Sequence, residues 1–151
     1  MTNKTIYFDM DGTFVNLYGV ENWLDDLVNK RVRPYAEAKP MFSFSIFARF
    51  LHRLQNNGYK IGIISWVAKN SNENYDSAVA ETKKTYLAKH LPSVKWDEIH
   101  ILKYGTPKSS VGCGYLFDDE EPNRTDWVEN GGVSFGVDNI FGELKNLLMV
   151  A

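Results

Sequence analysis

Short apolar segments alternate along this chain with longer segments in which apolar residues recur at helical spacing. The apolar segments predict β-strands at residues 5–8, 59–64, 98–102, 114–117 and 133–137. The helical spacing predicts α-helices at residues 21–29, between Pro40 and Gly58, and at residues 71–89, 122–128 and 140–150. Because strands connected through helices pair in parallel, we expect a three-layer α/β sandwich with a central, Rossmann-like parallel sheet. The length suits one domain, residues 1–151.

Polar residues follow three of the predicted strands. Asp9, Ser65 and Asp118 each come directly after an apolar segment. In parallel sheets, ligands bind beyond the carboxyl ends of the strands. The sequence therefore predicts that these three side chains gather in a ligand site at one edge of the sheet.

The segment Phe8-Asp9-Met10-Asp11-Gly12-Thr13 holds two carboxylates directly after the first predicted strand. A solvated polar turn is one interpretation, whereas a calcium loop is excluded because Gly12 comes too early and no second flanking helix fits. The pattern D-x-D-G-T after an apolar strand resembles the nucleophile loop of the haloacid dehalogenase superfamily. This resemblance implies that Asp9 attacks phosphorus to form an aspartyl-phosphate and that Asp11 is the general acid and base.

Two further positions match phosphate-binding groups of this superfamily. Ser65 stands at a strand end, where the family places a hydroxyl group that hydrogen-bonds the phosphate. The family also has a lysine that offsets the phosphate charge, and Lys103 and Lys108 compete for this role. We prefer Lys108, because it follows a proline at a helix-start position and lies ten positions before Asp118, a spacing similar to that of the deoxyribonucleotidases.

An acidic pair, Asp118-Asp119, follows the fourth predicted strand. Alone it reads as a solvated turn, but in a chain that also has Asp9 and Asp11 it resembles the superfamily's metal motif. Carboxylates facing a phosphate dianion repel it unless a cation is present. The resemblance implies Mg²⁺ bound by Asp9, Asp11 and Asp118, with Asp119 in a supporting position.

The four motifs occur in order, and within the superfamily the chain most resembles the 5′(3′)-deoxyribonucleotidases and their small bacterial or phage relatives. This resemblance implies a phosphatase that hydrolyses a small phosphorylated substrate, a nucleoside monophosphate. Residues 14–40 take the place of the family's cap but are shorter than the caps of the larger nucleotidases. A phosphatase of a polynucleotide end or a phosphoprotein stays an alternative, as does a non-catalytic binding protein. A homodimer in which a second subunit covers the site is compatible with so short a cap.

Aromatic residues are frequent around the predicted site. Those in or near the 14–40 segment and the strand end are Phe14, Tyr18, Trp23, Tyr35 and Trp66. We predict that Phe14 and Trp66 contact the substrate, in an aromatic wall on which a nucleobase would stack for ~1–3 kcal/mol. The alternative is that these rings fill a hydrophobic core, the commoner location of large aromatic residues.

The composition of the chain limits the classes of partner and the compartment that we expect. A net charge of −2 predicts no strong nucleic-acid binding, and the pairs Lys83-Lys84 and Lys30-Arg31 are predicted to lie on solvated helix faces. The single cysteine, Cys113, cannot form an internal disulfide, which favours a reducing compartment. No signal peptide and no apolar run near the ~20 residues of a membrane span is apparent, so we expect a cytoplasmic protein without membrane contact.

Overall fold

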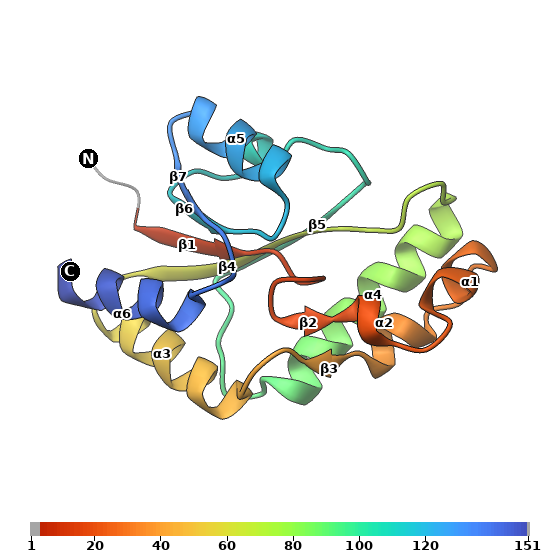
Figure 1. Ribbon diagram of the computed structural model, residues 1–151, viewed down its shortest axis with the longest axis horizontal. Coiled ribbons are helices and arrows are strands. Elements are labelled where there is room, and N and C mark those ends of the chain that lie inside the picture. The colour runs from red at the N-terminus through yellow and green to blue at the C-terminus, as the bar shows by residue number, and fades with distance from the viewer. Residues whose placement is uncertain (1–3, 151) are drawn as a thin grey trace.

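The computed structural model describes residues 4–150 and is built around a five-stranded parallel sheet (Figure 1). Its strands are β1 (Thr5–Phe8), β4 (Lys60–Trp66), β5 (Glu98–Leu102), β6 (Tyr115–Phe117) and β7 (Val133–Phe135). They lie in the order β5-β4-β1-β6-β7, and every neighbouring pair is parallel. Helices cover both faces of the sheet, which confirms the predicted three-layer α/β sandwich.

The helices divide between the two faces of the sheet. Those on one face are α3 (Phe44–Asn56), the C-terminal part of α4 (Glu73–His90) and α6 (Ile140–Val150), while α5 (Glu121–Glu129) lies on the other face. Ser43 caps α3 and Asn72 caps α4, each by accepting a hydrogen bond from a backbone N–H three residues on. Within residues 4–150, none of the helices combines the length and the apolar character needed to cross a membrane.

Side chains of β1 are buried on both faces, as expected of an interior strand in a parallel sheet. Ile6 and Phe8 join the large hydrophobic cluster under α3 and α6, whereas Tyr7 points to the other face and contacts Trp127 of α5. Phe8 also stacks on Phe117 of β6, with 5.1 Å between ring centroids. This packing fixes the carboxyl ends of β1 and β6, where the candidate site begins.

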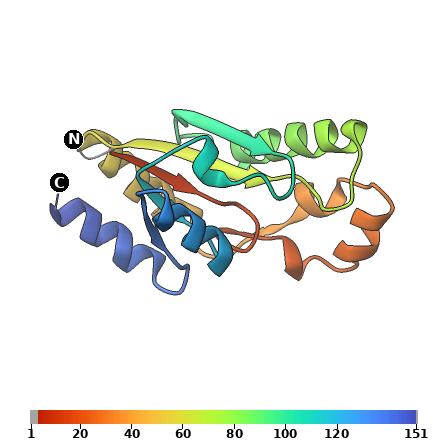
Figure 2. The same cartoon turned by 90° about the horizontal axis from the view of Figure 1, so that it is seen from above.

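Residues 15–40, named here the 15–40 segment, lie beyond the carboxyl end of β1 (Figure 2). Its elements are β2 (Val15–Asn16), the 3₁₀ helix η1 (Leu17–Gly19), α1 (Trp23–Val28), α2 (Arg33–Glu37) and β3 (Lys39–Pro40). Strands β2 and β3 pair antiparallel and close the segment at its base, and α2 packs on α4. The sequence predicts only α1 of these elements, because two-residue strands and a five-residue helix are too short to show periodicity.

Gly62 in β4 leaves the space that the Tyr7 ring occupies. A Cβ atom at this position would lie 2.8 Å from Tyr7 Cδ1, and the ring is held by Trp127 and by a hydrogen bond of its hydroxyl group to Glu98 at 3.0 Å. Gly62→Ala should therefore lower the free energy of unfolding by about 1–3 kcal/mol in urea denaturation. Gly136→Ala is the control, since its nearest neighbour is 4.0 Å away. Equal stability of the two variants would show that the Tyr7 ring moves freely.

Candidate active site

Hydrogen bonds that continue the sheet place two aspartates at its edge. Asp9 N donates to Phe117 O at 2.9 Å, and Asp118 N donates to a carbonyl at the end of β7 at 3.1 Å. Gly12 then turns the chain with a φ of 80°, and a Cβ atom there would collide with the Asp119 carboxylate. The glycine therefore allows the loop after β1 to approach the loop after β6.

Lys108 lies between these two aspartates. It is 2% exposed, and its Nζ donates to Asp9 Oδ1 at 3.0 Å and to Asp118 Oδ2 at 2.7 Å. Burial alone would lower the pKa of Lys108, but the two carboxylates outweigh burial and raise this pKa, so the ammonium group stays charged. Lys103, the other candidate, is exposed. The structure thus brings Lys108 to the site, on the short 3₁₀ helix η2 (Lys108–Ser110).

Asp9, Asp118 and Asp119 form a carboxylate cluster that could hold a metal ion. One oxygen of each lies within 4.8 Å of the others. This set differs from the predicted one: Asp119 belongs to it, whereas Asp11 turns its carboxylate toward Lys83. Burial, and after it the charge of Asp9, raises the pKa of Asp118 to about 6 and that of Asp119 to about 8. Carboxylate oxygens are the ligands that a hard divalent cation prefers.

Asp11 contacts a buried lysine of α4. Lys83 is 1% exposed, so the prediction that it lies on a solvated helix face is wrong. Its Nζ donates at 2.7 Å to each of three acceptors, which are Asp11 Oδ2, Ser65 Oγ and Trp66 O. Burial raises the pKa of Asp11, although the Lys83 ammonium opposes this shift. A sequence signal did exist, because Tyr75, Val79, Lys83 and Leu87 recur every four residues on the buried side of α4.

The first turn of α5 supports Asp118. Glu120 N donates to Asp118 Oδ1 at 2.9 Å, and Asn123 Nδ2 donates to Asp118 Oδ2 at 3.2 Å. The Arg124 guanidinium donates to the Asp118 backbone carbonyl at 2.9 Å. No sequence pattern points to Asn123 or Arg124 individually, although Pro122 does predict the helix start that carries them.

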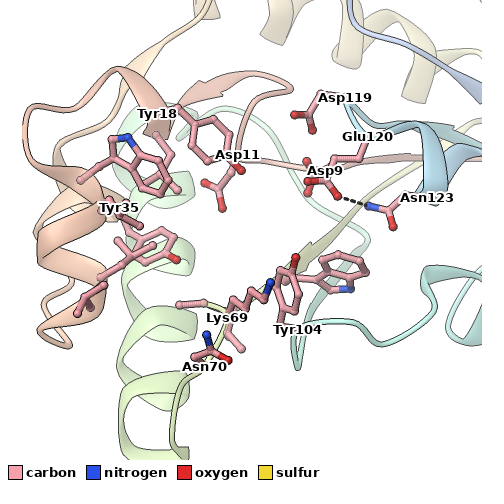
Figure 3. Close-up of a pocket in the computed structure, with 18 of the residues that line it drawn as sticks. Asp9, Asp11, Tyr18, Tyr35, Lys69, Asn70, Tyr104, Asp119, Glu120 and Asn123 are labelled. Atoms are coloured by element: carbon pink, nitrogen blue, oxygen red, sulfur yellow. Dashed lines mark hydrogen bonds between the residues drawn. The ribbon is translucent and has the colours of Figure 1, made fainter.

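A pocket of about 450 Å³ lies between the 15–40 segment and the edge of the sheet (Figure 3). Asp9, Asp11 and Asp119 line it, and in Figure 3 Tyr18 and Tyr35 of the 15–40 segment lie on the side of Asp11. The remaining aromatic residues of the lining are Trp23, Trp66 and Tyr104. Of the aromatic residues predicted from the sequence to form a wall, all but Phe14 line this pocket.

Phe14 is the exception. It is 0% exposed and packs in the core, with its ring centroid 5.2 Å from that of Phe47 and 6.4 Å from that of Phe8. The prediction that Phe14 contacts the substrate is therefore wrong. The physical reason is a tight turn, in which the N–H groups of residues 13–15 all donate to Met10 O and fold the chain back toward β1.

Trp66 lines the pocket, as the sequence predicts. Its Nε1 donates to Thr106 O at 2.8 Å, and its ring contacts the Tyr104 ring with 4.9 Å between centroids. The Lys108 ammonium lies 5.3 Å from the centroid of the Trp66 ring. The indole is therefore held in one orientation next to the lysine of the site.

Cationic and polar groups gather at the far end of the pocket from the carboxylates, where Figure 3 shows Lys69 and Asn70. Lys30 Nζ donates to Asn70 O at 2.7 Å and so connects the 15–40 segment to the loop after β4. Lys30 and Asn70 have φ angles of 57° and 54°, a conformation that few residues other than glycine adopt. One end of the pocket is therefore lined by carboxylates and the opposite end by Lys30 and Lys69.

A crystal structure of an uncharacterized protein from Corynebacterium glutamicum ATCC 13032 Kitasato, at 1.44 Å resolution, is similar to this fold. The two chains are 14% identical and superpose with a TM-score of 0.52, over 97% of this chain and 96% of the other. A likeness at this level of identity concerns the fold alone. No model of a protein family matches the sequence, and no curated protein matches it either. Function is therefore inferred from the residues of the site.

Proposed function

We propose that this protein is a Mg²⁺-dependent phosphomonoester hydrolase of the haloacid dehalogenase type that forms an aspartyl-phosphate intermediate. The observation that carries the proposal is the position of Asp9, whose carboxylate lines a pocket and accepts a hydrogen bond from the buried Lys108. A carboxylate side chain with a second carboxyl group, Asp11, in the same pocket suits nucleophilic attack assisted by proton transfer.

The proposed reaction has two displacements. In the first, an Asp9 oxygen attacks phosphorus, the ester P–O bond breaks, and Asp11 gives its proton to the departing oxygen. In the second, a water molecule loses a proton to Asp11 and its oxygen attacks the same phosphorus, while the bond between phosphorus and Asp9 breaks. Inorganic phosphate leaves, Asp9 is again a carboxylate and Asp11 is again protonated. Lys108 offsets negative charge on the phosphoryl group throughout.

Asp9, Asp118 and Asp119 are the residues that would hold Mg²⁺. When bound, Mg²⁺ supplies positive charge that offsets the repulsion between these carboxylates and a phosphate dianion. The donor set supports a hard cation, because it consists of carboxylate oxygens and contains neither sulfur nor imidazole.

The pocket supports a small substrate with a planar leaving group. Its volume of about 450 Å³ lies in the range of small-molecule sites. Aromatic rings on both sides favour stacking on a nucleobase, so we infer a nucleoside monophosphate. A polynucleotide end is less well supported, because the 15–40 segment forms one wall of the pocket.

The test is a phosphate-release assay with Mg²⁺ over nucleoside 5′- and 3′-monophosphates, sugar phosphates and 5′-phosphorylated oligonucleotides. The proposal predicts that nucleoside monophosphates have the highest kcat/KM. A preference for oligonucleotides would replace the small substrate by a macromolecular one. No release from any of these compounds would contradict the proposed reaction.

Trp66→Ala should impair hydrolysis of a nucleotide more than hydrolysis of a plain sugar phosphate. A stacking energy of ~1–3 kcal/mol corresponds to a selective loss in kcat/KM of roughly 5- to 150-fold. Trp96 is a suitable control, because it packs against the core and does not line the pocket. Trp96→Ala should change both substrates in the same proportion. An equal fall for the two substrates in Trp66→Ala would show that the indole serves the reaction generally and not the base.

A further inference from the structure

The hydrogen bonds of Lys83 use all the protons that its ammonium group carries. An ammonium group has three N–H bonds and no lone pair, and here the three acceptors are Asp11 Oδ2, Ser65 Oγ and Trp66 O. The side chain is 1% exposed and does not line the pocket. Lys83 therefore has no donor left for a substrate, and it acts only through the residues that it holds.

Asp11 is held by one oxygen and free at the other. Oδ2 accepts from Lys83, whereas among residues 4–150 the structure records no hydrogen-bond partner for Oδ1. The Asp11 side chain is 16% exposed and lines the pocket. Because Lys83 occupies Oδ2, Oδ1 is the Asp11 oxygen left to interact with a substrate in the pocket.

Ser65 is oriented by the same lysine. Its Oγ accepts from Lys83 at 2.7 Å, so the hydroxyl hydrogen cannot point toward the ammonium group. Within the described residues, 4–150, this hydrogen has no recorded acceptor. The Ser65 hydroxyl group is thus left free to donate this hydrogen, from a side chain that is 1% exposed and lies behind the pocket lining.

We propose that Lys83 is a positioning residue that fixes the Asp11 carboxyl group for proton donation and keeps the Ser65 hydroxyl group as a donor. The inference rests on the proposed phosphatase function. It gives the two buried lysines separate roles, because Lys108 serves the nucleophile Asp9 whereas Lys83 serves the general acid. Tyr35 of the 15–40 segment supports the arrangement, since its ring centroid lies 5.1 Å from Lys83 Nζ.

Leaving-group dependence tests this role. An alkyl phosphate needs a proton on its departing oxygen, whereas an aryl phosphate such as p-nitrophenyl phosphate leaves as a stable phenolate and needs little help. Lys83→Met should lower kcat/KM for the alkyl phosphate by about 10²-fold and for the aryl phosphate by less than about 10-fold. Lys84→Met is the matched control, since the neighbouring Lys84 side chain is 50% exposed and should leave both rates near those of the wild type.

The ratio of the two rates keeps the test valid if Lys83→Met folds poorly, because the amount of folded enzyme cancels from the ratio. A double-mutant cycle gives a second readout: in an Asp11→Asn background, Lys83→Met should add less than about 5-fold to the loss for the alkyl phosphate. An equal loss for the two substrates, or additive effects in the cycle, would overturn the positioning role. A wild-type protein that hydrolyses neither phosphate would instead contradict the phosphatase function itself, and the two failures are therefore distinct.

Discussion

Asp9→Asn should reduce phosphate release by about 10³-fold or more, by analogy with the removal of other covalent nucleophiles. The amide has nearly the shape of the carboxylate, but its oxygen cannot form a stable bond to phosphorus. Its oxygen can still accept from Lys108 as Asp9 Oδ1 does at 3.0 Å, and its amide group can donate toward Thr13 Oγ1, which lies 3.2 Å from Asp9 Oδ2. The fold should therefore persist. The measurement is kcat for a nucleoside monophosphate, together with thermal unfolding.

Asp25→Asn provides the comparison for this variant, because Asp25 is exposed in α1 and has no place in the site. Its kcat and Tm should match those of the wild type. Isothermal titration of Asp9→Asn with inorganic phosphate should still detect binding, since Lys108 remains. An Asp9→Asn protein with a rate close to that of the wild type would rule out the aspartyl-phosphate mechanism.

Chelation of divalent cations should abolish the activity, and Mg²⁺ should restore it. Asp9, Asp118 and Asp119 have oxygens within 4.8 Å of one another and repel a phosphate dianion, and the single Lys108 ammonium group offsets only part of this repulsion. The measurement is phosphate release after exhaustive treatment with EDTA and again after addition of Mg²⁺. Full activity in EDTA would mean that the carboxylate cluster has another purpose.

A thermal-shift experiment identifies the residues that bind the cation without relying on activity. Mg²⁺ that binds only the folded protein should raise its Tm. Asp119→Asn should reduce this increase, whereas Asp11→Asn should largely retain it, because the Asp11 side chain is paired with Lys83. The opposite result would support the set of ligands inferred from the sequence pattern, with Asp11 in place of Asp119.

The Mg²⁺-induced increase in Tm should also depend on pH. The pKa values of Asp118 and Asp119 in the folded protein are raised to about 6 and about 8, so without a cation the folded state binds protons more tightly than the unfolded state. This contribution to stability is complete below the ordinary carboxyl pKa of 3.8 and is lost as the pH rises through about 6 to about 8. Mg²⁺ should therefore raise the Tm more at about pH 8 than at about pH 5.

The sequence by itself determined the sheet and the residues at its edge. Each strand coincides with a short segment rich in apolar residues, and such a segment can be recognised from the local sequence alone. Asp9 and Asp118 follow such runs directly, and parallel pairing of β1 with β6 then brings them together. The choice of Lys108 over Lys103 also followed from local signals, its spacing to Asp118 and a preceding proline.

Only the tertiary structure decided which side chains are buried behind the site and which line the pocket. In the sequence, the pair Lys83-Lys84 is typical of a solvated helix face. Lys83 is nevertheless buried, because the loop after β1 and the end of β4 supply acceptors for its ammonium group. Phe14 and Trp66 are both aromatic residues close to a strand end, yet one turns into the core and the other lines the pocket. The amino-acid sequence gives the type of each residue. The direction of a side chain in a loop depends on hydrogen bonds and packing between segments that are distant in the sequence.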